Sequence, residues 1–184
     1  NYSDSKALSF KINAVSSAKC SVNLGATSYT YDGKVKTPTV TVKNAAGKVL
    51  KKNTDYTVTY AAGRKNVGTY KVTVKFKGNY TGTKTLTYKI NPVKTTVSKL
   101  TAGKKKLTVN ITKKSTQVTG YQIQYSTSKK FTSAKTKTIK TTKATVSSLK
   151  AKTTYYVRVR TYKTVGKTKY YSSWSTYKKV TTKK

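Results

Sequence analysis

Apolar and polar residues alternate in short runs along most of the chain, and no run keeps the 3.6-residue period of a helix. Alternation places successive side chains on opposite faces of an extended strand, so these runs predict half-buried β-strands. In the first half the expected strands are 19–24, 37–43, 48–50, 56–60, 68–77 and 83–90. In the second half they are 96–100, 106–112, 120–126, 136–140, 144–148, 155–162 and 170–180, the last broken near Ser172. The pattern therefore predicts an all-β fold of two tandem β-sandwiches.

A domain boundary is expected at Asn91-Pro92, because proline cannot donate to a strand ladder and restricts the residue before it. We expect one sandwich over residues 18–92 and another over 93–184. Residues 5–13 repeat residues 83–91 at an offset of 78 residues, with Lys, Leu, Lys, Ile and Asn identical. Since 83–91 should close the first sandwich, residues 1–17 are interpreted as the closing strand and linker of a preceding module.

Composition narrows the chemistry that the chain can perform. It holds 40 Lys and Arg residues against 3 Asp and Glu, and it has no His. Catalysis by paired carboxylates or Ser-His-Asp, and His-rich metal sites, all need residues that are scarce or missing here. We therefore expect no enzyme, no catalytic residues, no cofactor and no metal site. The single Cys20 alternates with Val22 and Leu24, which predicts a buried, unpaired thiol.

Positive charge is unevenly distributed along the chain. Residues 1–91 carry a net +13, whereas residues 92–184 carry +24 and no acid. Such a surface favours polyanions, so the expected partners are a wall polymer or sulfated glycan, or else a host cell-surface protein. Nucleic acid should bind only non-specifically, and no membrane insertion is expected. The densest lysines suggest a candidate polyanion patch of Lys104, Lys105, Lys106, Lys113 and Lys114. A solvated face without a specific partner explains the same charge.

The second half carries the motifs of one known kind of sandwich. Leu149 is followed six residues later by Tyr155, whose hydroxyl is expected to lock the corner before an alternating Val/Arg strand. Downstream, Tyr171-Ser-Ser-Trp174-Ser opens the final strand. With Gly120-Tyr-Gln-Ile-Gln-Tyr125, these motifs resemble a bacterial fibronectin type III module. Two departures weaken the match: Ile111 stands where the family usually has a core Trp, and Ala151 where its corner loop usually has Pro.

The first half resembles an Ig-like repeat of surface and secreted proteins from Gram-positive gut bacteria. The matching stretches are Tyr31-Asp-Gly33, Asp55-Tyr-Thr-Val-Thr-Tyr60, Asn66-Val-Gly68-Thr-Tyr70 and Gly78-Asn-Tyr80-Thr-Gly82. The resemblance implies a spacer or adhesion module, extracellular and either secreted or associated with the cell wall.

Arg158 and Arg160 lie two residues apart on one expected strand and so share a face. Tyr171 and Trp174 are expected on the neighbouring strand, where their rings can stack on the guanidinium groups. The pattern predicts an aromatic/Arg ladder that stabilises the fold; a recognition surface is the alternative.

Three functions are compatible with the sequence. The first is a non-enzymatic binding or spacer module of a Gram-positive bacterium that binds polyanions or a host surface. The second is a released, irisin-like fibronectin type III ligand for a host receptor. The third is an accessory module of a larger wall-active enzyme. Binding that weakens steeply with salt would separate the first from the second.

Overall fold

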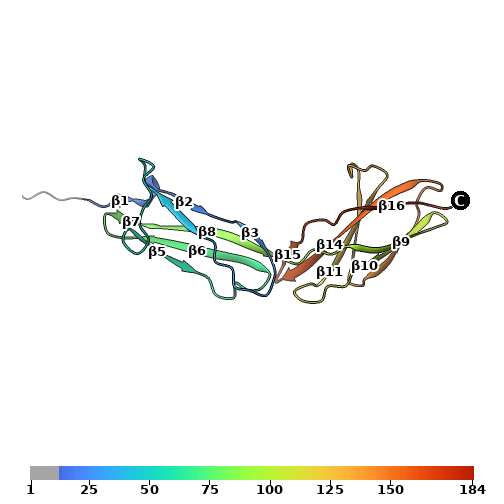
Figure 1. Ribbon diagram of the computed structural model, residues 1–184, viewed down its shortest axis with the longest axis horizontal. Coiled ribbons are helices and arrows are strands. Elements are labelled where there is room, and N and C mark those ends of the chain that lie inside the picture. The colour runs from blue at the N-terminus through green and yellow to red at the C-terminus, as the bar shows by residue number, and fades with distance from the viewer. Residues whose placement is uncertain (1–12) are drawn as a thin grey trace, which may run out of the picture. The chain divides into compact units, whose positions relative to one another are not determined.

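The computed structural model describes residues 13–184, and these residues form an all-β fold (Figure 1). Every strand pairing joins strands on the same side of Pro92, so the strands form two groups, β1–β8 and β9–β16. Helical structure in the described residues is limited to one 3-10 turn at Ser17–Lys19. The predicted all-β fold with tandem β-sandwiches is confirmed.

The first group contains three sheets. Strand bounds are β1 Val15–Ser16, β2 Ser21–Leu24, β3 Ser28–Thr30, β4 Val40–Lys43, β5 Tyr56–Tyr60, β6 Gly68–Phe76, β7 Tyr80–Thr81 and β8 Thr83–Asn91. The largest sheet has the order β3-β8-β6-β5, while β2 pairs with β4 and β1 with β7. The β1–β7 and β3–β8 pairs are parallel, whereas the β2–β4 and β5–β6 pairs are antiparallel.

Several expected boundaries in the first group differ from the structure. Lys19 lies in the 3-10 turn, where the Ser16 hydroxyl accepts the Ala18 N–H, so β2 starts at Ser21. The expected strand 48–50 is reduced to a single bridge between Lys43 and Val49. The short strands β1, β3 and β7 were not predicted, because two or three residues carry too little alternation to detect. The prediction for residues 5–13 lies outside the described residues, Asn13 excepted.

The core of the first group packs around Val42, Val74 and Phe76. Cys20 belongs to this cluster, is only 4% exposed and is a free thiol, as its alternation with Val22 predicts. Tyrosines at the core margin direct their hydroxyls to backbone carbonyls. Tyr60 donates to Pro38 O and Tyr88 to Lys36 O, both at 2.7 Å. The tyrosines therefore bury their rings without leaving a polar atom unbonded.

The second group forms two sheets. Strand bounds are β9 Val97–Gly103, β10 Lys106–Ile111, β11 Gly120–Ser126, β12 Lys135–Ile139, β13 Lys143–Val146, β14 Thr154–Val165, β15 Thr168–Tyr171 and β16 Lys178–Thr181. One sheet has the order β13-β10-β9 and the other β12-β11-β14-β15, with β16 also pairing β14. All of these pairings are antiparallel.

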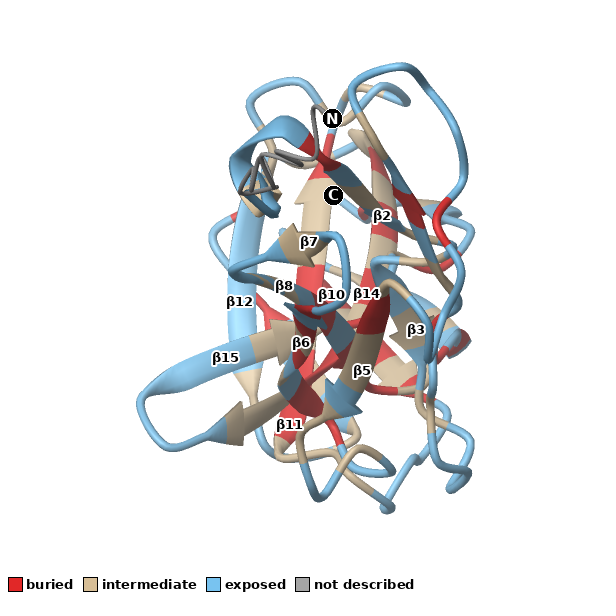
Figure 2. Cartoon of the chain, turned by 90° about the vertical axis from the view of Figure 1, so that its left-hand side faces the viewer, coloured by how far each residue is buried: buried red, intermediate tan, exposed pale blue. Residues whose placement is uncertain are grey.

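The two sheets bury alternate residues between them. Leu107 and Val109 of β10 pack in one cluster with Val157 and Val159 of β14, all four with no exposed surface. Ile111 also lies in this cluster at 4% exposure, so it fills the place where a Trp was expected. Strand β12 is mostly exposed, and β15 is exposed in its first half and of intermediate burial in its second (Figure 2). The long strand β14 lies between β11 and β15 in its sheet and carries Arg158 and Arg160.

Candidate functional site

Five side chains stack above β14 in an alternating series of rings and guanidinium groups. The guanidinium carbon of Arg160 lies 4.0 Å from the ring centroid of Tyr171 and 4.2 Å from that of Trp174. That of Arg158 lies 5.1 Å from Trp174 and 4.0 Å from Phe131. We call the series Phe131, Arg158, Trp174, Arg160 and Tyr171 the aromatic/Arg ladder. The structure thus brings together all four residues selected from the sequence and adds Phe131.

Two serines hold Trp174 above the arginines. The Ser172 hydroxyl accepts the Thr161 N–H at 3.1 Å, and the Ser175 hydroxyl accepts the Val159 N–H at 3.0 Å. Their own N–H groups donate back to the carbonyls of Thr161 and Val159. The two serine hydroxyls thus act as hydrogen-bond acceptors along β14 where backbone carbonyls usually do. The segment from Ser172 to Ser175 runs beside β14 but is not itself a regular strand. Trp174 lies on this segment, not on a neighbouring strand as expected.

Neighbouring glutamines fix the orientation of both guanidinium groups. Arg158 Nε donates to Gln124 Oε1 at 2.7 Å, and Arg160 Nε donates to Gln122 Oε1 at 2.8 Å. These pairs face each other in the β11–β14 register. The alternation Gln-Ile-Gln beside Arg-Val-Arg is a sequence signal that could have identified them. Burial lowers the pKa of both arginines. Each arginine has its Nε hydrogen-bonded and both faces of its guanidinium group covered by aromatic rings. This arrangement supports the interpretation that the ladder stabilises the fold.

The tyrosine corner forms as the motif predicts, with the backbone as its partner. The Tyr155 hydroxyl accepts the N–H of Lys150 at 3.1 Å, and Tyr155 is 7% exposed. Leu149, also buried, donates its N–H to the carbonyl of Lys105. At the site where proline was expected, the Ala151 carbonyl accepts the Thr153 hydroxyl at 2.8 Å. A side-chain bond therefore stabilises this turn in place of a proline ring.

Removing the corner hydroxyl should weaken the second sandwich. Tyr155→Phe deletes the acceptor of the Lys150 N–H, and a lost hydrogen bond costs about 1 kcal/mol. We expect the unfolding temperature to fall by roughly 5 °C. The chain has a single tryptophan, and it lies in the second group, so Trp174 fluorescence follows the unfolding of that group. Tyr177→Phe, at an exposed ring, is the control; equal shifts in both variants would contradict a role for the corner.

The candidate polyanion patch is not one patch, and this part of the prediction is wrong. Lys104, Lys105 and Lys106 lie at the β9–β10 turn, whereas Lys113 and Lys114 follow the opposite end of β10. A strand rises about 3.3 Å per residue, so the two lysine groups stand roughly 20 Å apart. Residues that are close in sequence lie far apart when the chain between them is an extended strand. The five lysines are all exposed, but they cannot contact the same short ligand.

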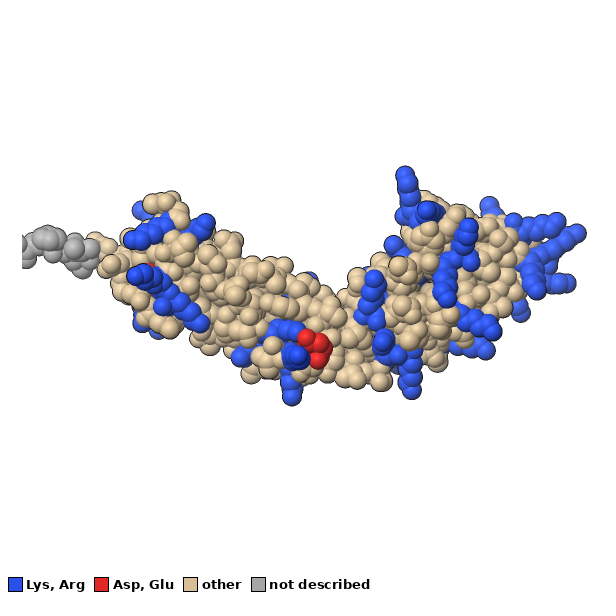
Figure 3. All heavy atoms as spheres, in the orientation of Figure 1, with Lys and Arg blue, Asp and Glu red and all other residues tan. Residues whose placement is uncertain are grey.

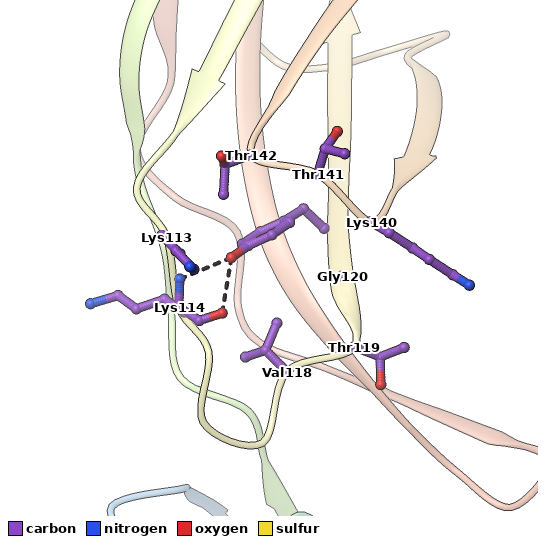
Figure 4. A pocket seen from close by; sticks show the side chains of 9 residues that line it. Lys113, Lys114, Val118, Thr119, Gly120, Lys140, Thr141 and Thr142 are labelled. Carbon is purple, nitrogen blue, oxygen red and sulfur yellow. Dashed lines mark hydrogen bonds between the residues drawn. The ribbon is translucent and has the colours of Figure 1, made fainter.

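Lys113 and Lys114 border a shallow hollow of about 360 Å³ beside Tyr121 (Figure 4). The Tyr121 hydroxyl accepts the N–H of Lys114 and donates to its carbonyl, both at 2.9 Å. The side chains of Lys114 and Lys140 extend away on opposite sides of the hollow (Figure 4). Since these charges diverge, the hollow does not concentrate them on one ligand.

The side chains that commonly bind metal ions, His, Cys, Asp and Glu, are scarce among residues 13–184. No group of three His, Cys, Asp or Glu side chains lies close enough there to hold a metal ion. The two acids of this range occupy turns: Asp32 contacts Lys36 at 2.5 Å, and Asp55 accepts the Lys51 N–H at 2.7 Å. The hydrogen bond from Lys36 lowers the pKa of Asp32. No helix of the described residues is long and apolar enough to cross a membrane.

Comparison with known proteins agrees with this geometry. Residues 91–177 match the model of the fibronectin type III domain, so this part of the chain is a fibronectin type III domain. No curated protein matches the chain. Since such domains are typically non-catalytic, the matched part is a generic binding or spacer module.

Solved structures give only distant matches. They include the FN1–FN3 domains of chicken CNTN1 (19% identity, TM-score 0.46) and domains A168–A170 of titin (16%, 0.41). A third is a beta-1,2-glucanase from Parabacteroides distasonis (13%, 0.41). The aligned regions cover 65%, 90% and 61% of this chain, and 44%, 66% and 18% of those chains. The chain thus spans less than half of the CNTN1 structure.

Proposed function

We propose that this chain is a non-enzymatic, extracellular binding and spacer module of a Gram-positive bacterium that attaches to polyanions. The observation that carries the proposal is the charge of residues 92–184, with 24 basic residues and no acid. No acidic side chain in this part can pair with a lysine, so the positive electrostatic field of its basic residues is not compensated. A field of one sign attracts polymers of the opposite sign over distances set by ionic strength.

Polymeric anions suit this surface better than single small anions. Lysines are the outward-facing residues of the exposed strands, such as Lys135 and Lys137 of β12, and they also stand in the turns. A small anion meets one or two of these charges in water, where an ion pair stabilises little. A polymer meets many of them and releases its counterions as it binds. Wall polymers and sulfated glycans are the extracellular polymers of this kind.

The extracellular bacterial setting rests on the resemblance of the first half to Gram-positive surface repeats. The chain's single, buried thiol suits a setting in which exposed thiols would be oxidised. A spacer role follows from the tandem arrangement of two β-sandwiches. The second sandwich holds neither His nor an acidic residue, so paired carboxylates and a Ser-His-Asp triad lack their residues there.

Retention of the full chain on immobilised polyanions tests the proposal. We expect it to bind heparin and teichoic acid at low salt and to elute as salt rises. For duplex DNA the logarithm of affinity falls with the logarithm of salt by about 0.9 per neutralised phosphate, and we expect similar behaviour here. A neutral dextran column is the control. Passage through both anionic columns at low salt, together with salt-resistant binding to a cell-surface protein, would favour the receptor-ligand alternative instead.

A further inference from the structure

Two turns and the segment after β16 bring lysines together from distant parts of the sequence at one end of the second sandwich. The β9–β10 turn supplies Lys104 and Lys105, the β13–β14 turn supplies Lys150 and Lys152, and Lys183 follows β16. All five are exposed. We call them the lysine pole. Figure 3 shows basic side chains projecting at the end where the chain terminates, beside β9 and β16 (Figure 1).

Hydrogen bonds and one β-bridge fix the two turns and the segment after β16 to each other. Lys104 and Lys183 pair in a parallel bridge, and the Lys183 N–H donates to Gly103 O at 3.0 Å. The Lys105 carbonyl accepts the Leu149 N–H at 3.0 Å. The Thr182 hydroxyl donates to Lys150 O at 2.6 Å. The pole lysines therefore project from a fixed backbone. The pole differs from the sequence-based patch because it omits Lys106, Lys113 and Lys114 and adds Lys150, Lys152 and Lys183.

Two pole lysines occupy a backbone conformation that disfavours them. Lys105 has a φ of 47° and Lys152 a φ of 46°, in the left-handed region that glycine or asparagine enters most easily. Each turn thus holds a lysine where a glycine would relieve strain. Strained residues in a charged cluster suggest that the side chain, not the turn, requires the residue.

We propose that the lysine pole is the main attachment site for a polymer of hydroxylated units bearing phosphate or sulfate, such as a sulfated glycan or a polyol phosphate. This proposal rests on the polyanion-binding function proposed above and identifies the part of the surface at which the polymer binds. Lys150 also borders a hollow of about 280 Å³, whose other lining includes Lys135 and the exposed hydroxyl residues Thr132, Ser133 and Ser148. Hydroxyls suit the hydroxyl groups of such a unit.

A hydroxylated polymer suits this end better than nucleic acid does. Recognition of single-stranded nucleic acid depends on aromatic faces for base stacking. Neither of the two turns nor the segment after β16 contains an aromatic residue. Two tyrosines border the hollow. Tyr155 is 7% exposed and its hydroxyl already accepts the Lys150 N–H, while Tyr125 is half-buried and packs against the core. The pole therefore presents positive charges and hydroxyl groups, but its turns present no exposed aromatic ring on which a base could stack.

A double substitution, Lys105→Gly with Lys152→Gly, tests the site in the full chain. It removes two pole charges and relieves two strained positions, so we expect unchanged or higher thermal stability together with earlier elution from heparin and teichoic acid. The salt slope should fall by roughly two, one for each lysine lost. The matched control, Lys113→Gln with Lys114→Gln, removes the same charge at the far end of β10 and should elute near the parent protein.

Three other results of this experiment would contradict either the lysine pole or the proposed function. Equal shifts in the two variants would overturn the pole and leave polyanion binding as a property of the whole surface. Failure of the parent chain to bind either polymer would overturn the proposed function itself. A duplex DNA column run in parallel covers the remaining case: if DNA is retained to higher salt than both polymers, and the pole variant alone loses that retention, the site belongs to nucleic acid.

Discussion

Replacing Trp174 with alanine is expected to lower the melting temperature of the second sandwich by about 10 °C. The indole ring lies between two guanidinium groups, at 5.1 Å from Arg158 and 4.2 Å from Arg160. Each cation–π contact contributes roughly 0.5–2 kcal/mol depending on desolvation, so the loss should reach about 2 kcal/mol. Alanine also uncovers the facing planes of both arginines. Differential scanning calorimetry measures the change, since the variant has lost the fluorescent reporter.

Two further variants separate the ladder from simple loss of volume. Trp174→Phe keeps an aromatic face between the arginines and should recover most of the stability. Gln122→Ala removes the acceptor of Arg160 Nε without touching any ring, and it should cost less than Trp174→Ala. If Trp174→Ala instead melts like the parent protein and loses binding to a partner, the ladder is a recognition surface and the structural interpretation is wrong.

The sequence was most informative where function depends on alternation within one strand. Arg158 and Arg160 share a face because strand side chains repeat every two residues, and the structure stacks both of them. The position of Tyr155 at the corner could be predicted for a similar reason, since its motif is local. The strands Tyr56–Tyr60 and Gly120–Ser126 were placed with their observed bounds, because their alternation is regular and glycine or polar turns flank them.

Contacts that depend on loop conformation could not be predicted in the same way. Phe131 reaches Arg158 from the β11–β12 loop, where its φ is 58°, and no periodicity indicates where such a ring points. The lysine pole escaped detection because its members come from three segments spread between Lys104 and Lys183, which meet only in the folded chain. The opposite error joined Lys106 to Lys113. They are close in sequence, but Lys106 begins β10 and Lys113 follows its other end.

Gly120→Ala is expected to be among the most damaging single substitutions in the second sandwich. A Cβ at this position would lie 2.4 Å from the Ile139 carbonyl oxygen and 2.8 Å from Tyr162 Cε1. The first is backbone in the paired strand β12, so the β11–β12 ladder must shift before alanine can fit. Forcing atoms into a packed site costs typically 1–3 kcal/mol, and contact with backbone favours the upper end.

The expected loss of about 3 kcal/mol corresponds to a fall of roughly 10–20 °C in the temperature at which Trp174 fluorescence reports unfolding. Gly103→Ala is the matched control, because there the added Cβ meets only the flexible side chain of Lys106, with the nearest atom, Cγ, at 2.9 Å. That side chain can move into solvent, so the control should stay within a few degrees of the parent. Equal shifts for the two glycines would mean that the close approach of β11 to β12 does not determine the cost. The loss would then come from the flexibility and conformation of glycine itself, and the packing argument at Gly120 would fail.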